Sequence, residues 1–383
     1  MKDVIIVGGG PAGLHAARLL ASAGLDVALL DAQAEIGERA ICSGVIGVEA
    51  FSRFDLPTDP IQNTIRRVEA ISPSGRKLLH SSTEPLAHVV NKGEFNRDLA
   101  ARAVSAGAQM WLGKVVESLE QQKHGVAARF RCRESRRQGR LRARAAIIAS
   151  GVNRSLTQSL GLVQPRDFLR AIQADIPLGK DGAARPTKIY VGQSVAPGAF
   201  GWKIPLGQGR VRLGLMASEE PRPYFEELLK KVAPHLPLSE CKVSQKVIGQ
   251  LPSGKCAADR ILVIGEAAGH VKTTTGGGIY YGLLSAEMAV EVLLRAFEQK
   301  SFTEQVLSEF ERYWRSTFGH EFGTGYFFRK LMARFPDSLL DRTFEKASSI
   351  DLLGRINGNL KFDWHYKAVV IAMQRLIVPS QQA

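Results

Sequence analysis

The sequence lacks any uninterrupted apolar run of about 18 residues or more, although 45% of its 383 residues are hydrophobic. A membrane-spanning helix needs about 18 such residues in a row, so we expect none. The first residues, MKDVIIVGGG, start directly as a strand, without the basic leader and cleavage site of a secretory signal. We therefore expect a cytoplasmic protein with a large buried core, divided into two or three domains.

Cysteine is scarce, and no two cysteines are close in sequence. The chain has 4 of them, at Cys42, Cys132, Cys241 and Cys256, and no C-x-x-C pair. This spacing argues against a disulfide framework and against a structural zinc site, so no metal is expected. Cys42 is the one cysteine that falls within a motif described below.

Acidic residues are rare between Lys123 and Arg144, where nine bases stand against one acid, Glu134. This segment is either a solvated β-hairpin with its tip at Arg136–Arg140, or a patch that meets anionic membrane head groups or an acidic protein. Polybasic clusters contribute about 1 kcal/mol per charge at anionic membranes. Aromatic residues do not alternate with these arginines as a stacking platform requires, so nucleic acid is not an expected partner.

Glycine, by contrast, is abundant and clustered, and the first cluster follows the first strand. Residues 4–30 predict a strand, a glycine turn, a helix and a second strand, with Gly8, Gly10 and Gly13 in G-x-G-x-x-G spacing. Such a turn lets the backbone and the helix N-terminus approach a pyrophosphate. Asp31 ends the second strand, where a carboxylate accepts hydrogen bonds from a ribose. The pattern predicts a dinucleotide site and does not choose FAD over NAD.

Two later segments end in similar small-residue turns. AIIASG (146–151) is a strand followed by a turn, and residues 261–293 are a strand, a turn, a Gly-Gly-Gly loop and the start of a helix. The backbone N–H groups of Gly276–Ile279 can face one side of a ring system. A helix N-terminus there would stabilise negative charge on a reduced flavin.

These segments together resemble the geranylgeranyl reductase family, within the flavoproteins that include aromatic-ring hydroxylases. The resemblance covers about residues 1–300. It is carried by the first glycine turn, by Cys42-Ser43-Gly44 (C-G-G in the family), by Ala199–Pro205 (G-Y-G-W-x-F-P) and by the T-G-G-G-I run at 275–279. The resemblance implies bound FAD and the saturation of carbon–carbon double bonds in polyprenyl chains of lipids or quinones.

The resemblance also implies site residues. The expected catalytic residues are Cys42 and Tyr280, and the expected substrate-binding residues are Phe200, Trp202 and Pro205. The expected cofactor-binding residues are Gly8, Gly10, Pro11, Ala12, Gly13, Asp31, Ala32, Arg39, Ala40, Cys42, Ser43, Gly44, Lys92, Val116, Ser150, Gly151, Gly265, Glu266, Gly277, Gly278 and Ile279.

The sequence departs from the family pattern in three ways. Glu266 replaces the aspartate of G-D-A-A-G, which shifts its carboxylate by one methylene. Lys92 stands where relatives usually carry arginine, so the planar two-pronged donor is lost. The proline expected shortly before T-G-G-G is absent, and Thr273 and Thr274 stand there.

The predicted fold is α/β. A Rossmann-like FAD-binding domain (1–65, 88–165 and 246–300) carries an inserted mixed or antiparallel β-sheet substrate domain (66–87 and 166–245), followed by a helical C-terminal region (301–383). That last region, rich in aromatic and basic residues, either packs on the cofactor domain as a layer or lies on a membrane surface as amphipathic helices.

The predicted reaction is hydride transfer from reduced FAD to an alkene, with a proton from Cys42, a tyrosine or water. NAD(P)H or a ferredoxin-like protein would supply the electrons. One alternative is a monooxygenase of an aromatic or other small molecule on the same fold. Another is a non-catalytic carrier of prenyl chains, which the intact glycine pattern disfavours.

Overall fold

The computed structural model describes residues 1–38, 41–179, 185–356 and 361–376. Its first sheet has the strand order β17 (Ala257–Ala258), β18 (Ile261–Val263), β11 (Gln138–Ile148), β1 (Lys2–Val7), β2 (Val27–Leu30) and β8 (Gln109–Trp111). The strands from β18 to β8 run parallel, and β10 (Gly125–Cys132) and β9 (Lys114–Gln122) extend antiparallel from β11. Runs such as VIIV, VALL and AAII are apolar throughout because both faces of this sheet are buried.

The second sheet has seven strands, in the order β16 (Ser244–Ser253), β12 (Gln164–Pro177), β15 (Arg210–Ala217), β14 (Phe200–Gly207), β13 (Thr187–Val191), β5 (Arg67–Ile71) and β6 (Lys77–Ser81). All its pairs are antiparallel except β13 with β5. A small sheet of β3 (Val45–Gly47), β7 (Ala87–Val90) and β4 (Ile61–Ile65) joins the two regions. The predicted boundary between residues 245 and 246 falls inside β16, which belongs to the seven-stranded sheet.

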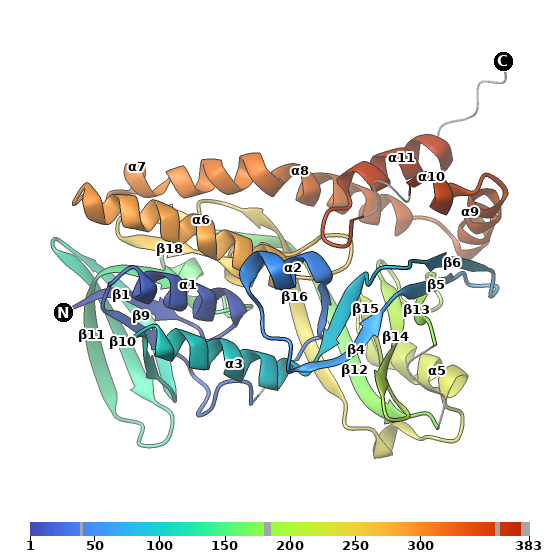
Figure 1. The fold of residues 1–383 in the computed structure, drawn as a ribbon, viewed down its shortest axis with the longest axis horizontal. Coiled ribbons are helices and arrows are strands. Elements are labelled where there is room, and N and C mark those ends of the chain that lie inside the picture. Colours follow the sequence, from blue (N-terminus) through green and yellow to red (C-terminus); the bar gives the residue numbers. More distant parts are fainter. Residues whose placement is uncertain (39–40, 180–184, 357–360, 377–383) are drawn as a thin grey trace.

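Helices cover the sheets as Figure 1 shows, with the long α6 and α8 side by side over the first sheet and α5 against the second. The helices are α1 (Pro11–Ser22), α2 (Val48–Phe54), α3 (Lys92–Ser105), α4 (Ser155–Ser159), α5 (Arg222–Val232), α6 (Ile279–Glu298), α7 (Glu304–Leu307), α8 (Glu309–Met332), α9 (Asp337–Ser349), α10 (Leu352–Ile356) and α11 (Tyr366–Leu376). Short 3₁₀ turns span Leu238–Glu240 and Gly265–Ala268.

The predicted fold class is confirmed: a Rossmann-like α/β domain, a mixed β-sheet region and a helical C-terminal region. The aromatic residues of α8 explain how the last region attaches. Phe310, Trp314, Phe318 and Phe322 are buried in the core of the cofactor domain, one helical turn apart. No helix in the described ranges is both long and apolar enough to span a bilayer.

Candidate functional site

The first glycine turn is fixed by backbone that approaches backbone. Gly8 has φ +114°, and a Cβ there would overlap the carbonyl oxygen of Ala149 at the end of β11. A Cβ at Gly13, in the first turn of α1, would overlap the carbonyl oxygen of Gly8. A Cβ at Gly10 would meet no heavy atom within 4 Å. Gly8 and Gly13 therefore hold the turn together, whereas the space in front of Gly10 is free for a ligand.

Asp31 lies beside this turn, at the end of β2. One carboxylate oxygen accepts a hydrogen bond from the Gly9 N–H at 2.6 Å, and the other accepts from the Gln33 N–H at 2.7 Å. Each oxygen retains a second lone pair, so the fixed carboxylate can still accept from ribose hydroxyls. Ala32, the next predicted residue, is exposed.

The three small-residue turns meet at one place. A Cβ at Gly265 would lie 2.9 Å from the Ala12 side chain, and a Cβ at Gly282 would lie 3.5 Å from it. A Cβ at Gly151, in the turn after β11, would lie 3.9 Å from a carboxylate oxygen of Glu266. The N-termini of α1 and α6 are thus neighbours, and neither has a side-chain cap or an acidic residue in its first turn.

This arrangement fits FAD. Two uncapped helix N-termini offer free backbone N–H groups and positive dipole ends, the first suited to the pyrophosphate and the second to the reduced flavin ring. Pro11 and Ala12 begin α1, and Gly278 precedes Ile279 at the start of α6. Ser150, by contrast, donates its hydroxyl to the Asn153 carbonyl at 3.0 Å and so shapes the second turn.

The threonines that replace the expected proline tie the Gly-Gly-Gly loop to the C-terminal region. The Thr273 hydroxyl donates to the Phe322 carbonyl of α8 at 2.8 Å, and the Thr274 hydroxyl lies 2.8 Å from Nδ1 of His365. The loop is also closed internally, because Lys272 N–H donates to the Gly277 carbonyl at 2.9 Å. Side-chain hydrogen bonds thus hold the loop where the family resemblance led us to expect a proline ring.

Cys42 is held by the seven-stranded sheet. Gln173 donates to the Cys42 carbonyl at 3.0 Å, and Arg212 donates to the Ser43 carbonyl at 2.8 Å. Arg212 is itself fixed by Asp175 through two contacts of 2.7 Å. The thiol accepts from the Gly44 N–H at 3.4 Å, and Gly44 has φ +73°. The residues beside this loop, Arg39 and Ala40, lie outside the described residues.

A cluster of charged residues faces Cys42. Lys92 is buried at the start of α3 and donates to Asn96, and Lys246 forms an ion pair with Glu266 at 2.7 Å. Burial lowers the pKa of Lys92 to about 8, although the nearby Cys42 opposes the shift. Burial also lowers the pKa of Lys246, but Glu266 more than offsets this, so the net pKa lies above its usual value.

An apolar cluster adjoins the Gly-Gly-Gly loop. A Cβ at Gly276 would lie 2.8 Å from the Met216 sulfur, and Met216 belongs to this cluster. Its buried members are Ile65, Ala87, Val89, Leu169, Trp202, Ile204, Leu206 and Met216, with Phe200, Ile248 and Phe362 packed against them. We call this set the Trp202 cluster.

The structure brings two of the three predicted substrate residues together. Phe200 and Trp202 are in edge-to-face contact with their ring centroids 6.0 Å apart. Side chains alternate between the two faces of a strand, so Pro205 lies on the opposite face of β14 from Phe200 and Trp202. That face is shared with Gly201, which lies next to Leu228 of α5. Its carbonyl accepts from Asn63 at 2.8 Å, which joins β14 to β4.

Tyr280 and Val116 lie in well-packed surroundings. The Tyr280 hydroxyl donates to Glu49 at 3.4 Å and accepts from the Trp364 indole at 3.2 Å, and burial raises its pKa. Val116 is a buried residue of β9, opposite Phe130 in β10. The structure therefore gives both residues packing partners besides any role in the site.

Sequence reasoning missed several residues at this site, among them Lys246, Arg212 and the segment 361–366. Lys272 forms a buried ion pair with Asp363 at 3.0 Å, and the Tyr281 hydroxyl donates to the Asp363 carbonyl at 2.5 Å. The two pairs are 91 and 82 positions apart in the sequence, so no local spacing could reveal them. Their only sequence signal was the density of aromatic residues near the C-terminus.

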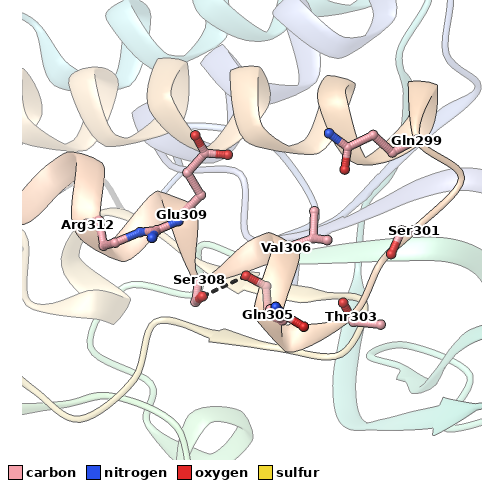
Figure 2. A pocket seen from close by; sticks show the side chains of 8 residues that line it. All are labelled: Gln299, Ser301, Thr303, Gln305, Val306, Ser308, Glu309 and Arg312. Carbon is pink, nitrogen blue, oxygen red and sulfur yellow. Dashed lines mark hydrogen bonds between the residues drawn. The ribbon is translucent and has the colours of Figure 1, made fainter.

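Figure 2 shows a different hollow, between the end of α6, α7 and the start of α8. It is lined by Gln299, Ser301, Thr303, Gln305, Val306, Ser308, Glu309 and Arg312. Val306 is the one aliphatic side chain among them, and the Ser308 hydroxyl donates to the Gln305 carbonyl at 2.8 Å. This polar lining does not suit an apolar ligand.

Comparison with known proteins points to FAD as the cofactor. The FAD binding domain family matches residues 1–174. The chain is 27% identical to digeranylgeranylglycerophospholipid reductase 1 of Methanothermobacter thermautotrophicus, over 92% of this chain and 94% of the relative. It is 28% identical to the digeranylgeranylglycerophospholipid reductase of Methanocaldococcus jannaschii, over 90% of each chain.

Solved structures share the fold. A geranylgeranyl bacteriochlorophyll reductase-like protein of Thermoplasma acidophilum matches with a TM-score of 0.86 at 22% identity, over 98% of this chain and 96% of that one. Halogenase PltM in complex with phloroglucinol and FAD matches with a TM-score of 0.68 at 17% identity, over 98% and 87%. The first match is the better of the two over the whole length of the chain.

Proposed function

The chain is an FAD-dependent oxidoreductase of the geranylgeranyl reductase kind, and on that premise we propose that it saturates double bonds of a polyprenyl chain on a lipid or quinone. One observation carries the proposal. Met216 packs against Gly276 of the Gly-Gly-Gly loop and is also a member of the Trp202 cluster. An apolar chain that lies against this cluster would therefore be next to the Gly-Gly-Gly loop.

Reduced FAD, when bound, supplies a hydride to one alkene carbon, and a proton must reach the neighbouring carbon. The protein's own residues have three tasks: to hold the chain, to exclude water and to provide that proton. An isolated alkene is a poor hydride acceptor, so the position of the chain is decisive. The partly buried side chains packed against the Trp202 cluster, such as Phe200 and Ile248, would be the apolar surface that an isoprenoid contacts.

Cys42 is the proton donor we favour. Its loop is fixed to the seven-stranded sheet through Gln173 and Arg212, and Lys92 and Lys246 lie close enough to act on it electrostatically. These cations would stabilise the thiolate left after proton transfer. The Tyr280 hydroxyl already donates to Glu49, which makes it the weaker candidate, with water as the remaining one.

The substrate we propose is lipid-linked, since the two reductases named above carry a digeranylgeranylglycerophospholipid in their names. Such a substrate resides in a membrane, so we place the enzyme in the cytoplasm, in peripheral contact with the anionic inner membrane face. The β10–β11 hairpin supports this contact only in part. Arg131 and Arg140 pair with Glu117 and Glu120, which neutralises some of its charge.

The electron donor is NAD(P)H or a ferredoxin-like protein. The sequence has one complete G-x-G-x-x-G turn after a strand, at Gly8–Gly13, so a nicotinamide cofactor would bind only transiently. To separate these donors, the oxidised holoprotein is mixed anaerobically with NADPH, NADH or reduced ferredoxin. The true donor is the one that makes the flavin lose its absorbance.

The test of the proposed function is a product mass measurement. The holoprotein is reduced with dithionite, incubated with geranylgeranyl lipids or menaquinone, and the products are analysed by mass spectrometry. The proposal predicts prenyl tails that are heavier by whole pairs of hydrogens, counted apart from the quinone ring, which dithionite itself reduces. Oxygen insertion into phenolic compounds would instead indicate a monooxygenase, and tight prenyl binding by a colourless protein would indicate a carrier.

A further inference from the structure

Glu266, the residue that replaces the family's aspartate, has a partner from the other region of the molecule. Its Oε2 atom lies 2.7 Å from Nζ of Lys246, which comes from β16 of the seven-stranded sheet. The side chains are 18% and 32% exposed. This pair is therefore partly shielded from solvent, and it crosses from the cofactor turn to the substrate sheet.

Lys246 lies among the cofactor loops. Glu266 adjoins Gly151 of the second turn, with 3.9 Å between its Oε2 atom and a Cβ built there. Ile248, two residues after Lys246 and on the same face of β16, is 3.4 Å from a Cβ built at Gly276. Strand β16 thus reaches both loops, with Lys246 at the turn 265–269 and Ile248 at the Gly-Gly-Gly loop.

A second ammonium group faces the same region. Lys92 is buried and donates a hydrogen bond to the neutral side chain of Asn96. Lys92 and Lys246 both act electrostatically on Cys42, and they repel one another. Lys92, Lys246 and Glu266 together hold two cations and one carboxylate. They therefore leave a net positive charge beside the space in front of the glycine turns.

We propose that Lys246 is a positioning residue of the FAD site, which holds the Glu266 carboxylate at its turn and favours reduced over oxidised flavin through its positive charge. The longer side chain of glutamate explains the departure from the family pattern, because it extends the carboxylate toward Lys246. The reduced flavin ring gains negative charge, and a nearby ammonium stabilises that charge. This inference rests on FAD binding and not on the identity of the substrate.

The test measures two properties of the holoprotein: the affinity for oxidised FAD and the midpoint potential of the bound flavin. Lys246→Met removes the positive charge, and we expect the preference for reduced FAD to fall about tenfold, which is about 30 mV more negative for a two-electron couple. Glu266→Gln removes the neutralising charge, and we expect a shift in the opposite, positive direction. Lys246→Arg keeps the charge and should restore most of the wild-type potential.

Lys230→Met is the matched control, because Lys230 also pairs with a glutamate, Glu227 at 2.6 Å, but on the exposed surface of α5. Its flavin potential should equal that of the wild type. The inference is overturned if Lys246→Met matches this control, or if the Lys246→Met and Glu266→Gln potentials move in the same direction. Neither result depends on prenyl reduction, so failure of the proposed reaction would leave this test intact.

Discussion

The glycine turns and the Trp202 cluster lie side by side but are built on different principles. At the turns, backbone meets backbone: a Cβ at Gly8 would overlap the Ala149 carbonyl, and a Cβ at Gly13 would overlap that of Gly8. In the cluster, side chains from β4, β7, β12, β14 and β15 fill a common space. The turns therefore tolerate one residue type at fixed positions, whereas the cluster tolerates many combinations of similar volume.

The largest effect should follow from a change at the turn itself. Gly8→Ala places a Cβ against backbone at φ +114°, so we expect the free energy of unfolding to fall by about 3 kcal/mol or more, with loss of bound FAD. Urea denaturation and the flavin content of the purified protein measure both effects.

Two glycine variants serve as controls for that change. Gly323→Ala on α8 meets no atom within 4 Å and should stabilise the helix by up to about 1 kcal/mol. Gly10→Ala should leave the apoprotein stable and weaken FAD binding alone. Normal FAD content in the Gly8→Ala protein would remove this turn from the cofactor site.

Trp202→Ala should produce the next largest effect, on the other side of the comparison. Removing this buried side chain should cost about 3 kcal/mol of stability or more and abolish prenyl turnover. The flavin spectrum should be retained, because the glycine turns remain intact. Loss of FAD together with turnover would show that the two regions are not separable, and Trp202→Phe should retain partial activity.

The buried ion pair between Lys272 and Asp363 joins both regions to the C-terminal segment. Asp363→Ala leaves the Lys272 ammonium with the Phe362 carbonyl at 2.6 Å, so we expect a loss of about 3 kcal/mol by urea denaturation. Glu227→Ala, which breaks an exposed pair, should have no measurable effect. Equal stability of the two variants would contradict the packing of segment 361–366 on the Gly-Gly-Gly loop.

A smaller effect should appear with pH. Burial lowers the pKa of Lys92 to about 8, so its ammonium is lost as the pH rises through that value. Cys42 and Lys246 are the other charged or titratable groups that act on it. If Lys92 contacts FAD, the affinity for FAD should fall above pH 8, and Lys92→Arg should flatten the profile.

Deprotonation of Lys92 should lower the affinity for FAD, but the same group makes the apoprotein more stable as the pH rises. The unfolded chain holds the Lys92 proton up to its ordinary pKa of 10.5, whereas the folded chain releases it near 8. Between these values the unfolded state binds more protons, so Lys92 makes the free energy of unfolding rise with pH.

The affinity measurement decides the role of Lys92 at the cofactor site. If the affinity of the wild-type protein for FAD does not change with pH, Lys92 does not contact FAD.

The contrast between the glycine turns and the Trp202 cluster also explains which site residues could be predicted from the sequence. Gly8, Gly13 and Asp31 were recognisable because backbone sterics and one terminal carboxylate impose fixed spacing. Lys246, Arg212 and Phe362 were not, because each meets its partners only after distant strands or helices are brought together. The departures at Glu266, Thr273 and Thr274 were visible, but their partners, Lys246, Phe322 and His365, emerged only in three dimensions.

The most direct test of the central claim is an anaerobic single turnover. Reduced holoprotein is mixed with a geranylgeranyl lipid in the absence of oxygen, and the return of oxidised-flavin absorbance is followed together with the number of double bonds lost. We predict that each flavin reoxidised corresponds to one double bond saturated. A flavin that stays reduced until oxygen is admitted would contradict the claim that the glycine turns and the Trp202 cluster serve one reaction.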